Sequence, residues 1–227
     1  MEKQTWLVTG GSSEVAEALF DELNDRLNDS IDVYAQYYSN SIEKKWDRID
    51  IHPICADLSK PTDVDRLIGE VTKDDRVITH IIHLAAVPYE SVRIKEWDSD
   101  RVERQMQVGL YSFAKICKAL VPGMAKRKDG QIVVMLTEAL KDETVPSSIC
   151  EYISVKSALE GYSKALMAEY ASKNISVHLF YPAMMETRFL KNINPRIIEL
   201  DAEKRPGGKH MTTNALAKEI LDKLVQR

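Results

Sequence analysis

The chain has 227 residues, of which 44% are hydrophobic and 29% are charged, as in an ordinary soluble globular protein. Its net charge of -4, without any basic block, gives no indication of a nucleic-acid partner or of binding to an anionic membrane. No signal peptide, membrane span or cysteine cluster is recognisable. We therefore expect a cytoplasmic protein without a metal site, folded as one domain over residues 1–227.

Strand-like and helix-like patterns alternate along the chain. Short apolar runs predict strands at residues 5–9, 31–38, 51–55, 77–84, 131–136 and 175–181. Apolar residues at three- and four-residue spacings predict helices at residues 14–27, 61–71, 97–127, 152–173 and 212–225. The alternation predicts an α/β fold with a doubly wound, mostly parallel sheet of six or seven strands and helices on both faces.

Three stretches carry less regular patterns. The helix at residues 97–127 is expected to be interrupted at Gly109 and to stop near Pro122. Residues 39–48 are polar and predict a loop or a short helix. Residues 186–211 contain several prolines and glycines, so we expect a mobile lid over a substrate there.

Tyr152 and Lys156 lie four residues apart at the start of a predicted helix, so their side chains should stand on one face. An ammonium beside a phenol favours the phenolate and lowers the tyrosine pKa from its reference of about 10. Such a tyrosine can donate or accept a proton near neutral pH. By itself the spacing is more often a half-buried tyrosine beside a solvated lysine, so the rest of the chain decides.

The first predicted strand ends in a glycine turn that opens a helix. The turn comprises Thr9, Gly10, Gly11, Ser12, Ser13, Glu14 and Val15. A turn of this kind presents backbone N–H groups and the positive end of the helix dipole to a phosphate. Doubly wound sheets bind ligands outside the carboxyl ends of their strands, which places this turn in the expected site.

Four features stand in the order typical of one protein family: the glycine turn, Asp57 after the third strand, the Tyr152/Lys156 pair, and Pro182 after the sixth strand. In this order, over almost the whole chain, they resemble the short-chain dehydrogenase/reductase family. Within that family the pattern is similar to 3-oxoacyl-acyl-carrier-protein reductases and related ketoreductases. The resemblance implies a Rossmann fold, a nicotinamide cofactor and hydride transfer.

The resemblance also implies roles for individual residues. Tyr152 would donate the proton, and Lys156 would lower the pKa of that phenol and hold the cofactor ribose. Thr137 would replace the serine that orients the carbonyl, although a strand-end threonine without a role is the alternative. Cofactor contacts are expected from Thr9, Gly10, Gly11, Ser12, Ser13, Glu14, Val15, Tyr38, Ser39, Asn40, Asp57, Leu58, Ala85, Ala86, Lys156, Pro182 and Thr187.

Several positions depart from the family pattern. Glu14 replaces a glycine of the turn; we interpret it as a solvated acid that complements the helix dipole, because near a diphosphate it would reduce cofactor affinity. Gly109 falls on the catalytic asparagine and cannot supply an amide, so a water molecule or Gln107 would have to compensate. His83 stands where the family has asparagine, either as a packing residue or as a hydrogen-bonding substitute.

The second predicted strand ends at Tyr38, Ser39 and Asn40, without an acid that would select NAD by binding the ribose 2′-hydroxyl. The serine and asparagine side chains could instead donate hydrogen bonds to a 2′-phosphate, with Lys44 and Arg48 nearby. This pattern favours NADP(H) over NAD(H).

Together these features predict an NADP(H)-dependent oxidoreductase that reduces a ketone, β-ketoacyl or polyketide-like, to an alcohol. The ketone would be a small molecule or carried by an acyl carrier protein. The departures at Glu14, Gly109 and Thr137 leave an alternative, a catalytically degenerate member that serves as a nucleotide-binding or protein-interaction scaffold. Family members pair through the helices that here carry Gly109 to Met124 and Tyr152, so we expect a homodimer.

Overall fold

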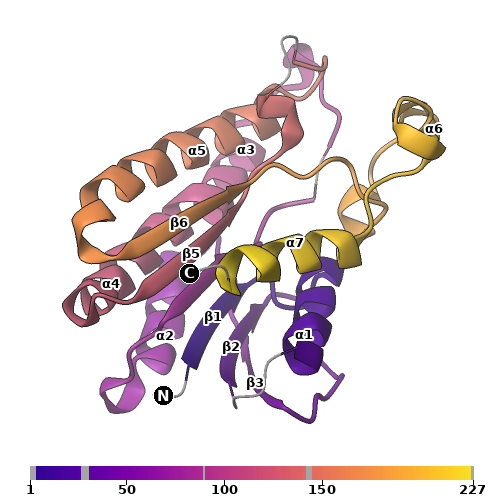
Figure 1. The fold of residues 1–227 in the computed structure, drawn as a ribbon. Coiled ribbons are helices and arrows are strands. Elements are labelled where there is room, and N and C mark those ends of the chain that lie inside the picture. Colours follow the sequence, from indigo (N-terminus) through magenta and orange to yellow (C-terminus); the bar gives the residue numbers. More distant parts are fainter. Residues whose placement is uncertain (1–3, 27–30, 89, 142–144, 226–227) are drawn as a thin grey trace.

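The computed structural model describes residues 4–26, 31–88, 90–141 and 145–225 of the chain (Figure 1). Its strands form a 6-stranded sheet in the order β3-β2-β1-β4-β5-β6, and every neighbouring pair is parallel. The strands are β1 (Gln4–Thr9), β2 (Ile31–Tyr37), β3 (Ile49–Cys55), β4 (His80–His83), β5 (Gly130–Met135) and β6 (Ile175–Phe180). The expected single-domain α/β Rossmann fold is confirmed, and the winding direction reverses between β1 and β4.

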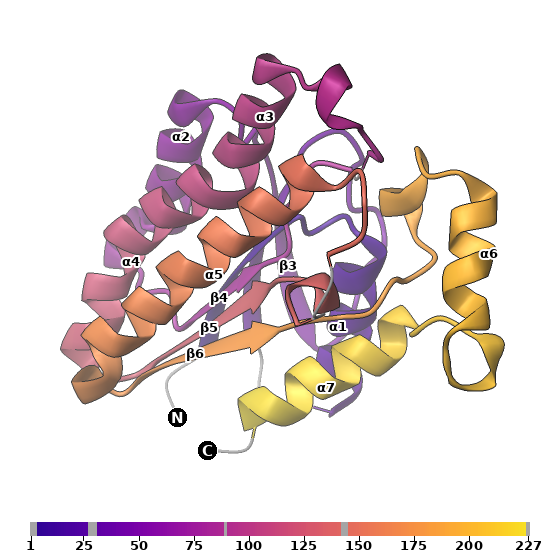
Figure 2. The same cartoon turned by 90° about the horizontal axis from the view of Figure 1, so that it is seen from above.

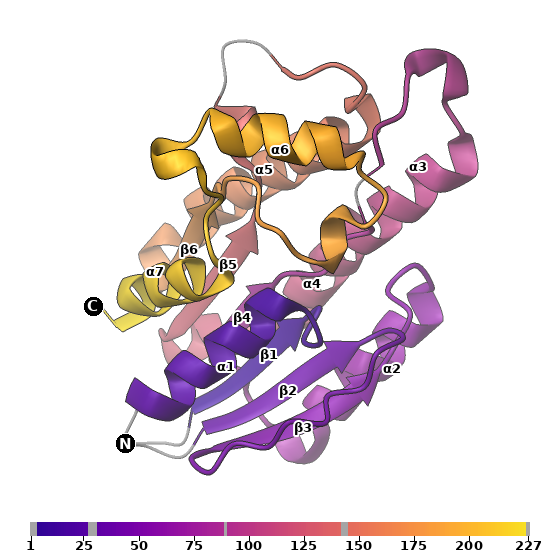
Figure 3. The same ribbon diagram turned by 90° about the vertical axis from the view of Figure 1, so that its right-hand side faces the viewer.

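Helices cover both faces of the sheet (Figure 2 and Figure 3). One face carries α2, α4 and α5, and the other carries α1 and α7. The helices are α1 (Glu14–Arg26), α2 (Pro61–Val71), α3 (Ser99–Met106), α4 (Ser112–Arg127), α5 (Cys150–Tyr170), α6 (Pro195–Glu203) and α7 (Thr213–Val225). Leu27, the predicted last residue of α1, lies outside the described residues. Within the described part of the chain, every helix is too short or too polar to cross a lipid bilayer.

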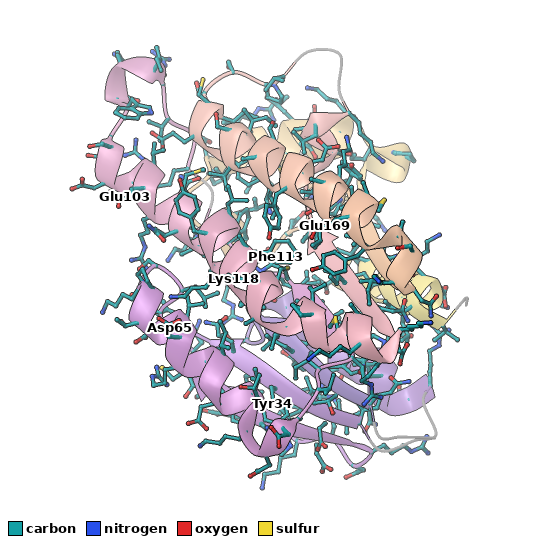
Figure 4. All side chains as sticks on the ribbon, turned by 90° about the vertical axis from the view of Figure 1, so that its left-hand side faces the viewer. Tyr34, Asp65, Glu103, Phe113, Lys118 and Glu169 are labelled. Atoms are coloured by element: carbon teal, nitrogen blue, oxygen red, sulfur yellow. The ribbon has the colours of Figure 1, made fainter. Side chains whose placement is uncertain are left out.

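Each face of the sheet is sealed by its own apolar cluster. Phe20 of α1 and Leu221 of α7 belong to one cluster, and Phe113 of α4 and Leu159 of α5 belong to the other. Figure 4 looks onto the second face and shows Phe113 between α4 and α5, where its ring lies edge-on to Tyr162 at 5.9 Å between centroids. Burying one such side chain stabilises the folded state by about 1.5–3 kcal/mol. The two clusters therefore hold the helices firmly on the sheet and fix the positions of the strands whose carboxyl ends form the site.

The helical pattern over residues 97–127 consists of α3, a π turn at Gln107–Tyr111, and α4, one after another. The expectation that the helix stops near Pro122 was wrong, because this proline lies inside α4. Val121 and Met124 beside it are fully buried. We infer that their packing outweighs the cost of an internal proline, which is about 3 kcal/mol.

The segment of residues 186–211 contains a helix, α6, that the sequence pattern did not predict. The side chain of Asn194 caps it by accepting a hydrogen bond from the backbone N–H of Arg196 at 2.9 Å, and Pro195 occupies the first helical position. In Figure 2, α6 stands beyond the carboxyl ends of the strands and packs on neither face of the sheet. Asn194 and Pro195 are residues typical of a helix start, but the glycines later in the segment led us to expect an irregular loop instead.

Candidate active site

A cleft of about 1740 Å³ opens at the carboxyl ends of the strands, around the point where the winding reverses. Pockets for one small molecule are typically about 300–1,000 Å³, so this cleft has room for a dinucleotide together with a second molecule. Thr9 and Gly11 are buried beneath the cleft, and all the other predicted site residues line it. The structure therefore brings the predicted constellation together in one place.

The glycine turn has no space for side chains at two positions. Gly10 has a φ of +68°, and a Cβ there would lie 2.9 Å from the backbone nitrogen of Ala85. A Cβ on Gly11 would lie 2.8 Å from the Cβ of Ala35. The hydroxyl of Ser13 then accepts a hydrogen bond from the backbone N–H of Ala16 at 3.2 Å and caps α1. The turn thus brings bare backbone to the edge of the cleft.

Beneath the turn, His83 joins β1, β4 and the π turn. Its Nε2 lies 3.1 Å from the carbonyl oxygen of Gly109, and its Nδ1 lies 2.8 Å from the hydroxyl oxygen of Thr9. Since a carbonyl only accepts, Nε2 carries the proton and Nδ1 accepts from the threonine. Complete burial, together with the positive charge of Lys156, lowers the pKa of His83 to about 3. His83 is therefore a neutral hydrogen-bonding residue.

Lys156 is held in a fixed position at the floor of the cleft. Its side chain is only 7% exposed, and its ammonium donates a hydrogen bond to the carbonyl oxygen of Met135, at the end of β5, at 2.6 Å. The Nζ atom lies 5.9 Å from the centre of the Tyr152 ring. Burial lowers the pKa of Lys156 to about 8, so the ammonium still predominates at neutral pH.

The start of α5 is joined to α3 by a partly buried ion pair that the sequence did not reveal. Glu151, next to Tyr152, is 7% exposed and accepts two hydrogen bonds from the guanidinium of Arg101, at 2.7 and 2.6 Å. A bidentate pair of this kind fixes direction as well as distance. It orients the first turn of α5, where Tyr152 lies. Arg101 and Glu151 are too far apart in the chain for spacing to indicate the contact.

Thr137 follows β5 and lines the same cleft as Tyr152 and Lys156. Its hydroxyl oxygen accepts a hydrogen bond of 3.4 Å from the backbone N–H of Ala139, which leaves the hydroxyl proton to donate elsewhere. The next residue, Glu138, donates its backbone N–H to the carbonyl oxygen of Pro182 at 3.1 Å. The ends of β5 and β6 are thereby joined at the cleft wall.

At the other end of the cleft, Asp57 accepts hydrogen bonds from the backbone N–H and the hydroxyl of Ser59, at 3.0 and 2.7 Å. Burial acts to raise the pKa of Asp57, but these hydrogen bonds and the neighbouring cations outweigh it and lower the pKa. Arg104 arrives here from α3, with its guanidinium carbon 5.5 Å from the centre of the Tyr38 ring. One of its nitrogens donates to the hydroxyl of Ser59 at 3.1 Å. No sequence pattern indicated this cation.

The model of the short chain dehydrogenase family matches residues 4–197. The chain belongs to this family. A 3-oxoacyl-[acyl-carrier-protein] reductase of Bos taurus is 25% identical over 147 residues, which cover 64% of this chain and 60% of the relative. The match thus spans less than two thirds of that relative's length.

Solved structures resemble the fold of this short-chain dehydrogenase over nearly its whole length. A 3-oxoacyl-[acyl-carrier protein] reductase from Brucella melitensis has a TM-score of 0.80 at 21% identity, covering 96% of this chain and 83% of its own. A second such reductase structure from Brucella melitensis, with bound NAD, has a TM-score of 0.78 at 20% identity, covering 97% and 84%. At these identities the likeness establishes the shared fold.

At Gly109, which the sequence comparison aligned with the family's asparagine, the structure leaves little room for a side chain. A Cβ on Gly109 would lie 2.7 Å from Cγ1 of Val155, so a larger side chain would require the Val155 side chain or α5 to shift. A cavity of about 10 Å³, roughly the space of one water molecule, lies between Gly109, Gln105, Tyr152 and Lys156. The amide that lines this space belongs to Gln105, on α3.

Glu14 is an acid in the first turn of α1, as expected, but the expectation that it is merely solvated was wrong. Its carboxylate is one third exposed and accepts hydrogen bonds from both the backbone N–H and the Nε of Arg188, at 3.0 and 2.7 Å. Arg188 belongs to the segment of residues 186–211. The departure at Glu14 therefore has a partner on the opposite wall of the cleft.

The same segment is anchored a second time near Thr137. Arg205 forms a bidentate ion pair with Glu138 and a second ion pair with Asp201 of α6, whose carboxylate also lies 3.2 Å from Nε2 of His210. Earlier in the segment, the ring of Phe189 lies 6.1 Å from that of Tyr152. The predicted lid segment thus contributes one wall of the cleft at the end where Tyr152 lies.

Proposed function

We propose that this short-chain dehydrogenase is an NADP(H)-dependent reductase that converts a ketone to an alcohol. The observation that carries the proposal is the pair at the start of α5, a buried ammonium one helical turn from Tyr152, both lining the cleft that begins at the glycine turn. A positive charge next to a phenol favours the phenolate, so Tyr152 can release its proton near neutral pH. An incidental tyrosine and lysine would not be expected to share such a cleft.

The residues along the cleft fit a nicotinamide dinucleotide. At Gly10 and Gly11 only backbone fits, so the turn and the first turn of α1 can face a diphosphate directly. Asp57 would meet the adenine edge and Lys156 the nicotinamide ribose. Thr187, after β6, would hydrogen-bond the carboxamide. When bound, the cofactor supplies the hydride.

The protein groups supply position and a proton. A ketone oxygen between the hydroxyls of Thr137 and Tyr152 would accept hydrogen bonds from both. Tyr152 gives up its proton as negative charge develops on that oxygen, and Lys156 stabilises the phenolate left behind. A positioned acid contributes roughly two to four orders of magnitude in rate, and alignment of the reacting groups contributes further.

Two features support NADP(H) over NAD(H). The turn after β2 consists of Tyr38, Ser39 and Asn40 and contains no acid to repel a 2′-phosphate. Arg104 brings a cation to the same end of the cleft, above the ring of Tyr38. An arginine is suited to phosphate because its donors form a planar fork.

We further propose a β-ketoacyl or polyketide-like ketone as substrate, presented as a small molecule or on an acyl carrier protein. Exposed apolar side chains around the mouth of the cleft, those of Val145, Ile197 and Leu200, suit an acyl chain. The bovine relative is a 3-oxoacyl-[acyl-carrier-protein] reductase, which supports the same substrate class. We place this activity in the cytoplasm.

A homodimer is proposed through α4 and α5. Tyr111, where the π turn meets α4, is 50% exposed, and Met167 of α5 is 37% exposed. Apolar side chains on adjacent helices suit a two-fold contact. Light scattering should give about twice the 25.8 kDa of one chain, and about four times that mass would contradict the dimer.

The alternative is a scaffold that has lost catalysis, and the glycine at 109 is the observation that favours it. Fluorescence titration with NADPH separates the reductase from a scaffold that only binds other proteins, and a nucleotide-binding scaffold would bind NADPH without turning over a ketone. The reductase predicts saturable binding. Absence of binding at millimolar NADPH would contradict the reductase and leave the scaffold.

The decisive test is Tyr152→Phe. The variant should bind NADPH as the unmodified protein does, while its turnover of a model β-keto thioester should fall at least a hundredfold, because the proton donor is lost. Tyr162→Phe, on the same helix but directed at Phe113, is the matched control and should retain turnover. Turnover that survives Tyr152→Phe would show the mechanism to be wrong.

A further inference from the structure

Arg188 makes three hydrogen bonds to the glycine turn and the helix that it opens. Its backbone N–H and its Nε both donate to one carboxylate oxygen of Glu14, at 3.0 and 2.7 Å. Its Nη2 donates to the backbone carbonyl oxygen of Ser12 at 2.7 Å. Three donors from one residue hold the guanidinium at the rim of the turn.

This position puts a positive charge where a diphosphate is expected. Ser12 and Glu14 flank Ser13, the cap of α1, so the arginine stands beside the first turn of that helix. Its side chain is 55% exposed and lines the cleft. A guanidinium has five N–H donors, and the two hydrogen bonds of the Arg188 guanidinium use only two of them, one on Nε and one on Nη2. The remaining donors are able to bind a further anion.

The contact with Arg188 suggests what Glu14 does at a position where the family has a glycine. Burial acts to raise the pKa of Glu14, but its hydrogen bonds with Arg188 outweigh this and lower the pKa. The ionised carboxylate anchors the arginine, and the arginine neutralises a charge that would otherwise repel a diphosphate. An acid at this position is costly in isolation and useful as one half of a pair.

We propose that Arg188 binds the diphosphate of the dinucleotide cofactor, held in place by Glu14. The inference rests on the proposed function, because it requires a dinucleotide in the cleft. The residue that binds the diphosphate comes from the wall beyond β6, opposite the glycine turn. Its neighbour Phe189 lies against Tyr152, so cofactor binding and the shape of the catalytic end are linked through two adjacent residues.

The test compares dissociation constants for NADPH, measured by fluorescence titration. Arg188→Gln should weaken binding by roughly tenfold to a hundredfold, the range for a lost hydrogen bond to a charged group. Affinity for adenosine 2′-monophosphate, which has no diphosphate, should not change. Arg196→Gln, on the exposed side of α6, is the control and should bind NADPH normally.

A second experiment, in a Glu14→Gln protein, distinguishes direct binding of the diphosphate by Arg188 from simple neutralisation of the Glu14 charge. If Arg188 only neutralised Glu14, then Arg188→Gln would have no effect in a Glu14→Gln protein, because no charge would remain to neutralise. The proposal predicts that Arg188→Gln weakens NADPH binding in that background too, by at least fivefold. Melting temperatures of the variants within a few degrees of each other would show that they fold.

The outcomes are distinguishable. If the unmodified protein binds NADPH and Arg188→Gln binds it equally well, the role of Arg188 is contradicted while the reductase stands. If the unmodified protein does not bind NADPH, the proposed function itself is wrong. Equal losses for NADPH and adenosine 2′-monophosphate would contradict a contact with the diphosphate.

Discussion

The two walls of the cleft are held by different kinds of contact. On the nucleotide side, α1 packs on the sheet through fully buried side chains such as Leu19 and Phe20. On the substrate side, none of the residues of α6 is buried. The segment of residues 186–211 buries Leu190 and Ile193 before this helix, and ion pairs of Arg188 and Arg205 hold it on either side of α6. Exposed ion pairs contribute only about 0–1 kcal/mol each, far less than an apolar core. We therefore expect a rigid nucleotide wall and a substrate wall that can open.

The largest effect should come from breaking the rigid wall. Gly10→Val would place a β-branched side chain at a φ of +68°, with its Cβ 2.9 Å from backbone of the β4 loop. We expect NADPH affinity to fall more than a hundredfold and the melting temperature to fall by several degrees, since left-handed backbone costs an ordinary residue about 1–2 kcal/mol before any clash.

Gly69→Ala is the matched control for this variant. A Cβ at Gly69, inside α2, meets nothing within 4 Å. Because glycine inside a helix costs roughly 0.5–1 kcal/mol relative to alanine, this change should leave binding intact and raise stability slightly. Equal behaviour of the two variants in titration and thermal melting would contradict the close approach at the turn.

The difference between the two walls also explains which parts of the fold and of the site could be predicted from the sequence. The rigid wall rests on local signals: apolar periodicity located the strands and helices, and spacing located the turn and the α5 pair. The sequence did not indicate Arg101, Arg104, Arg188 or Arg205, because ion pairs between distant segments leave no periodic trace. The fit of Gly109 against Val155 is of the same kind, since it depends on how two helices pack.

Deprotonation of Lys156 should change turnover and the free energy of unfolding in opposite directions as the pH rises. Its pKa of about 8 in the folded protein lies below its ordinary value of 10.5. Turnover should fall as pH rises through about 8, approaching tenfold per unit, as the ammonium beside Tyr152 is lost. Between pH 8 and 10.5 the unfolded state binds more protons at this group, so its contribution to stability rises with pH.

The pH dependence is checked by pH profiles of kcat and by denaturant unfolding. Lys156→Arg keeps a positive charge throughout this range, so its lower activity should not show the loss above pH 8. A profile for the unmodified protein that stays flat to pH 10 would contradict the assignment to Lys156.

A smaller effect is expected from loosening the substrate wall. Arg205→Met removes the ion pairs to Glu138 and Asp201. The KM for a β-keto thioester such as acetoacetyl-coenzyme A should rise severalfold, up to about tenfold, because each of the two partly exposed ion pairs contributes about 0–1 kcal/mol. NADPH affinity and melting temperature should change little.

Trypsin supplies a readout of the wall that is independent of activity. Cleavage after Lys191, Lys204 and Lys209 should be faster in Arg205→Met. Arg196→Met is the control, since among the residues that the structure describes the ion pairs of this arginine are those with Glu199 and Glu203 on the exposed side of α6. A large fall in melting temperature for Arg205→Met would indicate that this wall belongs to the folding core.

The smallest effect should appear at the adenosine end, where the rigid wall carries an exposed cation. Arg104 is 43% exposed and partly neutralised by Asp57 at 3.9 Å, so its net attraction for a 2′-phosphate is modest. Arg104→Met should lower the preference for NADPH over NADH about two- to fivefold, the range for an exposed ion pair, and the difference should shrink at high salt.

Arg66→Met is the control: this arginine donates to the carbonyl oxygen of Cys55 at 2.8 Å, outside the cleft lining. A preference unchanged in Arg104→Met would assign cofactor choice to Ser39 and Asn40 alone, and would place selectivity entirely in the turn after β2.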